Sequence, residues 1–194
     1  EKFNVNVSEA PTPWLDPGAE KRYKDEMDKD GIYGMTAASP LMSALYGARS
    51  CRPDANIPTL RLARKVTKWS KYNDRQLLRF LGYLKYSADL ALSGSLSTAD
   101  KDTAVVRLWP DADLAGDPLN DANSTNGQWL EIASADGSRC MPIHWSAQKG
   151  TSISDSTTTA ELDSMHVALK SDGLPVVELL EKLLGRPVYL EVCE

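Results

Sequence analysis

The chain has 194 residues, of which 42% are hydrophobic and 25% charged, and its formal net charge is −5. This composition is typical of a globular protein that folds as one large domain or two small ones. No run approaches the roughly 18 apolar residues of a membrane helix, so no membrane partner is expected. The polar first 30 residues do not resemble a secretory leader, and because the chain begins with Glu we expect an excised fragment.

Residues 1–30 are expected to form an extended, Pro-interrupted arm that is poorly ordered or lies as a strap on another domain. Apolar spacing then predicts helices at 38–50, 55–70 and 75–87, with Asp74 as the cap of the third. Residues 31–95 should therefore form a small helical unit.

A basic block lies within this unit. Residues 49–85 hold ten basic and two acidic residues, for a net charge of +8, whereas the rest of the chain carries −13. Such a block on an acidic chain favours a polyanion, and nucleic acid is the candidate partner; the alternative is an ordinary solvated helix face. The candidate nucleic-acid-binding residues are Arg61, Arg64, Lys65, Lys68, Lys71 and Arg75.

After Gly94 the pattern changes to strands. Residues 103–109, 128–133 and 139–146 predict three strands, and Asp136-Gly137 indicates a hairpin turn. Two helices at 155–171 and 175–184 and a fourth strand at 187–193 complete an α/β or α+β order.

Three carboxylates are candidate ligands in this region. Asp111 and Asp113 directly follow the first strand, and Glu161 lies early in the helix at 155–171. Carboxylates from a strand end and a packed helix can meet over one face of a sheet, and such oxygen ligands suit Mg²⁺. Two such ions support phosphodiester hydrolysis. The alternative is that Asp-x-Asp is a solvated turn.

The cysteines point to the compartment. Cys51, Cys140 and Cys193 lie far apart, with no Cys-x-x-Cys pair. An odd number of scattered cysteines disfavours a disulfide framework or a zinc site and fits a reducing, intracellular compartment.

Several short motifs occur in order along the chain. Residues 109–117 read Trp-Pro-Asp-Ala-Asp-Leu-Ala-Gly-Asp, and 123–127 read Asn-Ser-Thr-Asn-Gly. His-Trp-Ser-Ala-Gln-Lys follows at 144–149 and Ser-Thr-Thr-Thr-Ala-Glu at 156–161, while Cys-Arg-Pro-Asp at 51–54 and Leu-Arg-Phe-Leu-Gly-Tyr-Leu-Lys at 78–85 lie upstream. Together these motifs resemble the Pol polyprotein of copia-type (Pseudoviridae-like) retrotransposons. The run at 109–117 is similar to that family's Asp-Ala-Asp-Trp-Ala-Gly run, and the two upstream motifs resemble signatures of the region that closes the reverse transcriptase.

The resemblance implies an α/β fold for residues 101–194: an RNase H-like mixed sheet, truncated after its fourth strand, with three antiparallel strands and a fourth parallel to the first. It implies catalytic roles for Asp111 and Glu161, which with Asp113 would hold Mg²⁺ or Mn²⁺. The implied partners are an RNA–DNA hybrid and the polymerase domain of the same polyprotein, in cytoplasmic virus-like particles or the nucleus.

The chain also departs from the family. Leu114 stands where the family has Trp, and Thr159 stands where it has Glu. The family's third carboxylate follows the strand at 187–193, so this chain alone is expected to have little RNase H activity. The alternatives are a decayed or non-catalytic fragment that binds or connects nucleic acid and polymerase, and an unrelated protein with accidental motifs.

Overall fold

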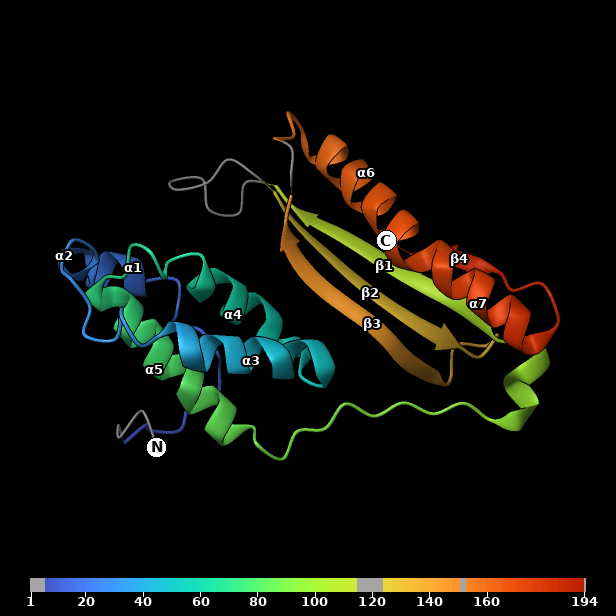
Figure 1. The fold of residues 1–194 in the computed structure, drawn as a ribbon, viewed down its shortest axis with the longest axis horizontal. Coiled ribbons are helices and arrows are strands. Elements are labelled where there is room, and N and C mark those ends of the chain that lie inside the picture. Colours follow the sequence, from blue (N-terminus) through green and yellow to red (C-terminus); the bar gives the residue numbers. More distant parts are fainter. Residues whose placement is uncertain (1–5, 115–123, 151–152, 194) are drawn as a thin grey trace. The chain divides into compact units, whose positions relative to one another are not determined.

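The computed structural model describes residues 6–114, 124–150 and 153–193. The chain forms two compact units, Glu1–Leu92 and Ser93–Glu194 (Figure 1). The described part of residues 1–30 belongs to the same unit as the helices that follow it.

The first unit is helical. Its helices are α1 (Ala19–Arg22), α2 (Lys24–Met27), α3 (Ala38–Ser50), the short 3₁₀ helix η1 (Pro53–Ala55), α4 (Asn56–Ala63) and α5 (Lys71–Tyr86). The predicted helix at 38–50 is confirmed. The helix predicted over 55–70 ends at Ala63, and the third helix begins at Lys71, four residues earlier than expected.

The early start of α5 has a local cause. Ser70 is the N-cap: its hydroxyl accepts a hydrogen bond from the backbone N–H of Asn73, and the Asn73 side chain bonds back to the backbone of Ser70. This reciprocal capping box satisfies N–H groups that have no partner within the helix. The expectation that Asp74 caps the helix was wrong, because Asp74 lies in the first turn and bonds to other segments.

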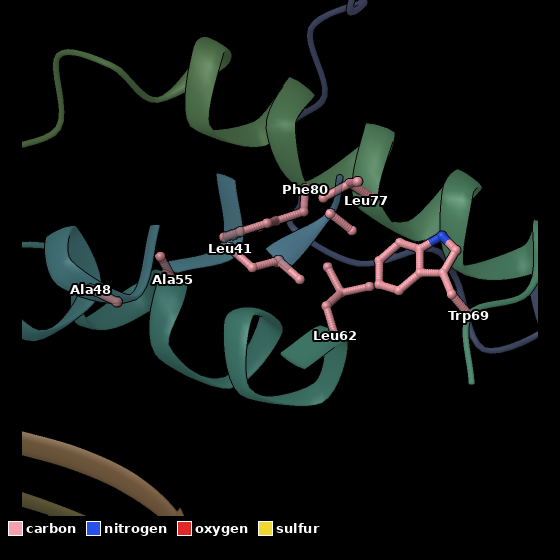
Figure 2. Close-up of a cluster of buried hydrophobic side chains, with 8 residues drawn as sticks. Leu41, Ala48, Ala55, Leu62, Trp69, Leu77 and Phe80 are labelled. Atoms are coloured by element: carbon pink, nitrogen blue, oxygen red, sulfur yellow. The ribbon is translucent and has the colours of Figure 1, made fainter. Parts of the chain in front are cut away.

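The core of the first unit lies between α3, α4 and α5 (Figure 2). Leu41, Leu62, Leu77 and Phe80 are fully buried, and the Trp69 ring packs beside them. Leu41 lies on α3 and Leu62 lies on α4. Leu77 and Phe80 share one face of α5. Burial of these side chains is the main stabilising contribution that holds the three helices together.

The second unit contains a four-stranded mixed sheet. Its strands are β1 (Val105–Asp113), β2 (Thr125–Ala133), β3 (Cys140–Lys149) and β4 (Leu190–Val192), in the spatial order β3-β2-β1-β4. The β1–β2 and β2–β3 pairs are antiparallel, and β4 is parallel to β1. The predicted arrangement of three antiparallel strands and a fourth parallel to the first is therefore confirmed.

Helices cover one face of this sheet. The helices α6 (Thr157–Ala168) and α7 (Leu174–Leu184), joined by the π-helical turn η3 (Leu169–Gly173), run along the sheet (Figure 1). Val106, Leu108 and Leu130 from the strands form a buried cluster with Ala168 and Val188. A further 3₁₀ helix, η2 (Thr98–Asp102), precedes β1.

The other face of the sheet carries a row of aromatic rings. Trp109, Trp129 and Trp145 stand opposite one another in register on three adjacent strands. The rings of Trp129 and Trp145 are stacked, with centroids 5.6 Å apart. Side chains alternate between the two faces of a strand, so this row lies on the face opposite Leu108 and Leu130.

Candidate functional site

Asp111 and Asp113 lie at the C-terminal end of β1, and both are exposed. In the neighbouring strand β2, Asp111 is opposite Gly127 and Asp113 is opposite Thr125. A Cβ atom built on Gly127 would lie 3.9 Å from the Cβ of Asp111, which is ordinary van der Waals contact.

Glu161 is exposed near the start of α6. This helix begins after Ser156, whose hydroxyl accepts a hydrogen bond from the Thr159 N–H at 3.2 Å. One turn after Glu161, the Ser164 hydroxyl donates a 2.7 Å hydrogen bond to the backbone carbonyl of Asp111. This bond joins the helix that carries Glu161 to the strand end that carries Asp111.

Two of the three predicted carboxylates, Asp111 and Asp113, share one face of β1. Leu108 packs under the helices, and strand alternation then directs Asp111 and Asp113 toward the opposite face. Within the described ranges 6–114, 124–150 and 153–193, no three His, Cys, Asp or Glu side chains are gathered so that they could hold a metal ion. Carboxylates have the right chemistry for Mg²⁺, but a site made by these three stays a prediction. Residues 115–117 and 123 of the motifs lie outside the described residues.

A polar cluster on the helix-covered face was not predicted from the sequence. Gln128 on β2 donates a 2.6 Å hydrogen bond to Asp172 in η3, and Asp172 also lies 3.6 Å from Nε2 of His144 on β3. Asn126 lies on the same face of β2 as Gln128, and Ser146 and Gln148 lie on the same face of β3 as His144. No break in an apolar pattern therefore marks the cluster in the sequence, and the third partner comes from a helix 44 positions after Gln128.

The structure distributes the six predicted nucleic-acid-binding residues over different environments. Lys68 is exposed, whereas Arg64 and Lys65 are half-buried. One terminal nitrogen of Arg64 is buried and has no hydrogen-bond partner among the described residues. The Arg61 guanidinium lies 5.8 Å from the ring centroid of Trp14, a cation–π contact.

The remaining two cations, Lys71 and Arg75, are paired with Glu26. Arg75 bonds to both oxygens of the Glu26 carboxylate at 2.5 and 2.9 Å, and the Lys71 ammonium lies 3.3 Å away. The hydrogen bond from Arg75 is the largest cause that lowers the pKa of Glu26 to about 2, and Lys71 adds to it. Because the pKa of Glu26 is lowered on folding, the contribution of this contact to stability is fully present above the ordinary pKa of 4.5 and is lost as the pH falls toward 2.

Comparison of the chain with protein family models, with curated proteins and with solved structures finds no match. None of the helices in the described parts of the chain is long and apolar enough to cross a membrane.

Proposed function

We propose that the second unit is the RNase H-like domain of a copia-type retrotransposon Pol polyprotein, which hydrolyses the RNA strand of RNA–DNA hybrids. The first unit is then the helical region that closes the reverse transcriptase, and it binds the same hybrid through its phosphates. The polymerase domain of the polyprotein is the second partner, in cytoplasmic virus-like particles or in the nucleus.

The observation that carries this proposal is the topology of the sheet. The order β3-β2-β1-β4, with β4 parallel to β1, agrees with the arrangement that the motif resemblance implies. The helix that carries Glu161 lies between β3 and β4 in the chain and packs against β1, which carries Asp111. Both motif-matched carboxylates thus come from the elements expected of them.

The candidate residues have separate roles. Asp111 and Glu161 would be the main ligands of Mg²⁺ or Mn²⁺, with Asp113 beside them, and a bound ion supplies activated water and stabilises developing charge. In the first unit, Arg64 and Lys68 are basic residues for which no ion-pair partner is found among the described residues, and they would contact phosphates. Recognition of a hybrid rests on backbone shape and 2′-hydroxyl groups, so binding is expected to be nearly independent of sequence and sensitive to salt.

A second candidate function is a non-catalytic fragment of a retroelement that binds the hybrid or connects polymerase and nuclease. The direction of Asp111, away from the face on which α6 lies, favours this candidate.

A cleavage assay separates the two. The chain, in excess over a hybrid labelled on its RNA strand, is incubated with Mg²⁺, Mn²⁺ or EDTA, and duplex DNA and duplex RNA of the same sequence serve as controls. The proposal predicts slow cleavage, limited to the RNA strand of the hybrid and absent in EDTA, because Asp111, Asp113 and Glu161 alone provide few ligands for two ions. Salt-sensitive binding without cleavage would support the non-catalytic candidate, and the absence of both would reject each of them.

A further inference from the structure

The chain's own N-terminal segment contacts the basic face of α5. We call residues 6–28 the N-terminal strap. The four basic residues of α5 are Lys71, Arg75, Arg79 and Lys85, and with Gly82 they are spaced by four, four, three and three positions. This spacing places them on one face of the helix.

Each of these four cations contacts the strap. At the C-terminal end of α5, the Lys85 ammonium lies 3.4 Å from the backbone carbonyl of Val7 and 3.9 Å from the Glu9 carboxylate. In the middle, Arg79 donates a 3.0 Å hydrogen bond to the carbonyl of Thr12. At the N-terminal end, Lys71 and Arg75 share Glu26.

The strap therefore lies along the whole basic face, from Lys85 back to Lys71. It carries six acidic and three basic residues, so its net charge is negative. Its carboxylate and carbonyl oxygens occupy the positions at which the phosphate oxygens of a nucleic acid would meet the same cations.

Gly82 allows the strap to approach α5 closely. The Ala10 N–H donates a 3.2 Å hydrogen bond to the carbonyl of Gly82, and a Cβ atom at position 82 would lie only 2.3 Å from the carbonyl oxygen of Ser8. Any side chain at this position would push the strap away from α5. By contrast, a Cβ atom at Gly47, which is also helical, would meet no atom within 4 Å.

We propose that the N-terminal strap is an autoinhibitory segment, which occupies the phosphate-binding face of α5 and must leave that face before an RNA–DNA hybrid binds there. The inference rests on the proposed function, because it assumes that the first unit binds the hybrid. It adds that the carboxylate and carbonyl oxygens of the strap compete with the phosphate oxygens of the hybrid for the same four cations.

The first test changes charge. Glu26→Gln removes the carboxylate that pairs with two cations of α5, and Glu20→Gln removes the same charge from an exposed position of the strap. We expect Glu26→Gln to tighten binding to a short RNA–DNA hybrid about tenfold at moderate salt, and to steepen the salt slope by up to about 2, since two phosphate contacts become available. Glu20→Gln should leave the slope unchanged.

The second test changes the surface of α5 on which the strap packs, without changing its charge. Gly82→Ala should displace the strap and tighten hybrid binding, whereas Gly47→Ala should not, although both substitutions favour helix equally. Circular dichroism confirms that each variant keeps its helices. In the wild-type chain, saturating hybrid should also remove the hydrogen-exchange protection of the Ala10 amide.

The outcomes are distinct. If the hybrid binds but Glu26→Gln matches Glu20→Gln and Gly82→Ala matches Gly47→Ala, the strap is only structural and this inference fails while the proposed function stands. If no variant binds the hybrid, the hybrid-binding part of the proposed function fails and the inference fails with it.

Discussion

Replacing Glu161 with glutamine should slow metal-dependent cleavage of the RNA strand of a hybrid by about 100-fold or more. Glutamine keeps the shape of the side chain but removes the negative charge that a divalent ion requires, and a catalytic ion contributes several kcal/mol to transition-state stabilisation. Asp111→Asn should have an effect of similar size, because Asp111 is the other motif-matched ligand. Both residues are exposed, so neither substitution should unfold the unit.

The matched control is Glu178→Gln. Glu178 lies exposed on α7, and its ion pair with Lys182 one turn later contributes little to stability. Cleavage rates are measured with protein in excess, and folding is checked by circular dichroism. Equal rates for the Glu161 and Glu178 variants would show that Glu161 takes no part in the reaction and would remove the main support for a catalytic role.

Truncating Asp74 to alanine should destabilise the first unit by about 3–5 kcal/mol, because one buried and two partly buried N–H groups lose their acceptor. The Asp74 side chain accepts hydrogen bonds from the backbone N–H groups of Ile32 and Tyr33, at 2.7 and 3.1 Å, and from the Trp69 indole at 2.7 Å. It thereby joins the segment before α3, the segment before α5 and α5 itself. Asp74 is only 5% exposed, so water cannot readily replace it.

Residue-resolved hydrogen exchange measures this effect, with amides of β2 in the second unit as an internal reference. The amides of α5 should lose protection while those of β2 keep it. Asp89→Ala, at an exposed position after α5, is the control and should change stability by less than about 0.5 kcal/mol. The same protection of α5 in both variants would contradict the structural role of Asp74.

Local patterns predicted most of the sheet. The β-rich run at 103–109, the alternating run at 128–133 and the turn at Asp136-Gly137 depend only on neighbouring residues, and the structure confirms the three predicted strands. The role of Asp74 could not be predicted in this way. Its carboxylate oxygens accept hydrogen bonds from N–H groups 41 and 42 residues earlier in the chain. No local spacing encodes such a contact. The local sequence therefore predicted that Asp74 caps the helix, although Ser70 provides the cap.

The same limit applies to the basic residues and to the candidate carboxylates. The sequence shows that Arg75 belongs to a basic block, but the pairing with Glu26 bridges 49 positions. Likewise, the motif locates Asp111 at a strand end, but which face it takes depends on register and on the face that α6 covers. Composition thus predicted the presence of charges and not their partners.

The short length of β4 has a consequence for the strand beside it. β4 pairs with β1 only from Val106 to Leu108, so beyond Leu108 β1 has β2 as its one strand partner among the described residues. The same strand is therefore central in its first half and an edge in its second half. Edge strands are templates for pairing with other chains, and proteins commonly place charges on them to prevent this. Asp111 and Asp113 lie on that edge segment, so their negative charges oppose aggregation whether or not they bind a metal. Light scattering of the Asp111→Asn variant measures aggregation separately from cleavage.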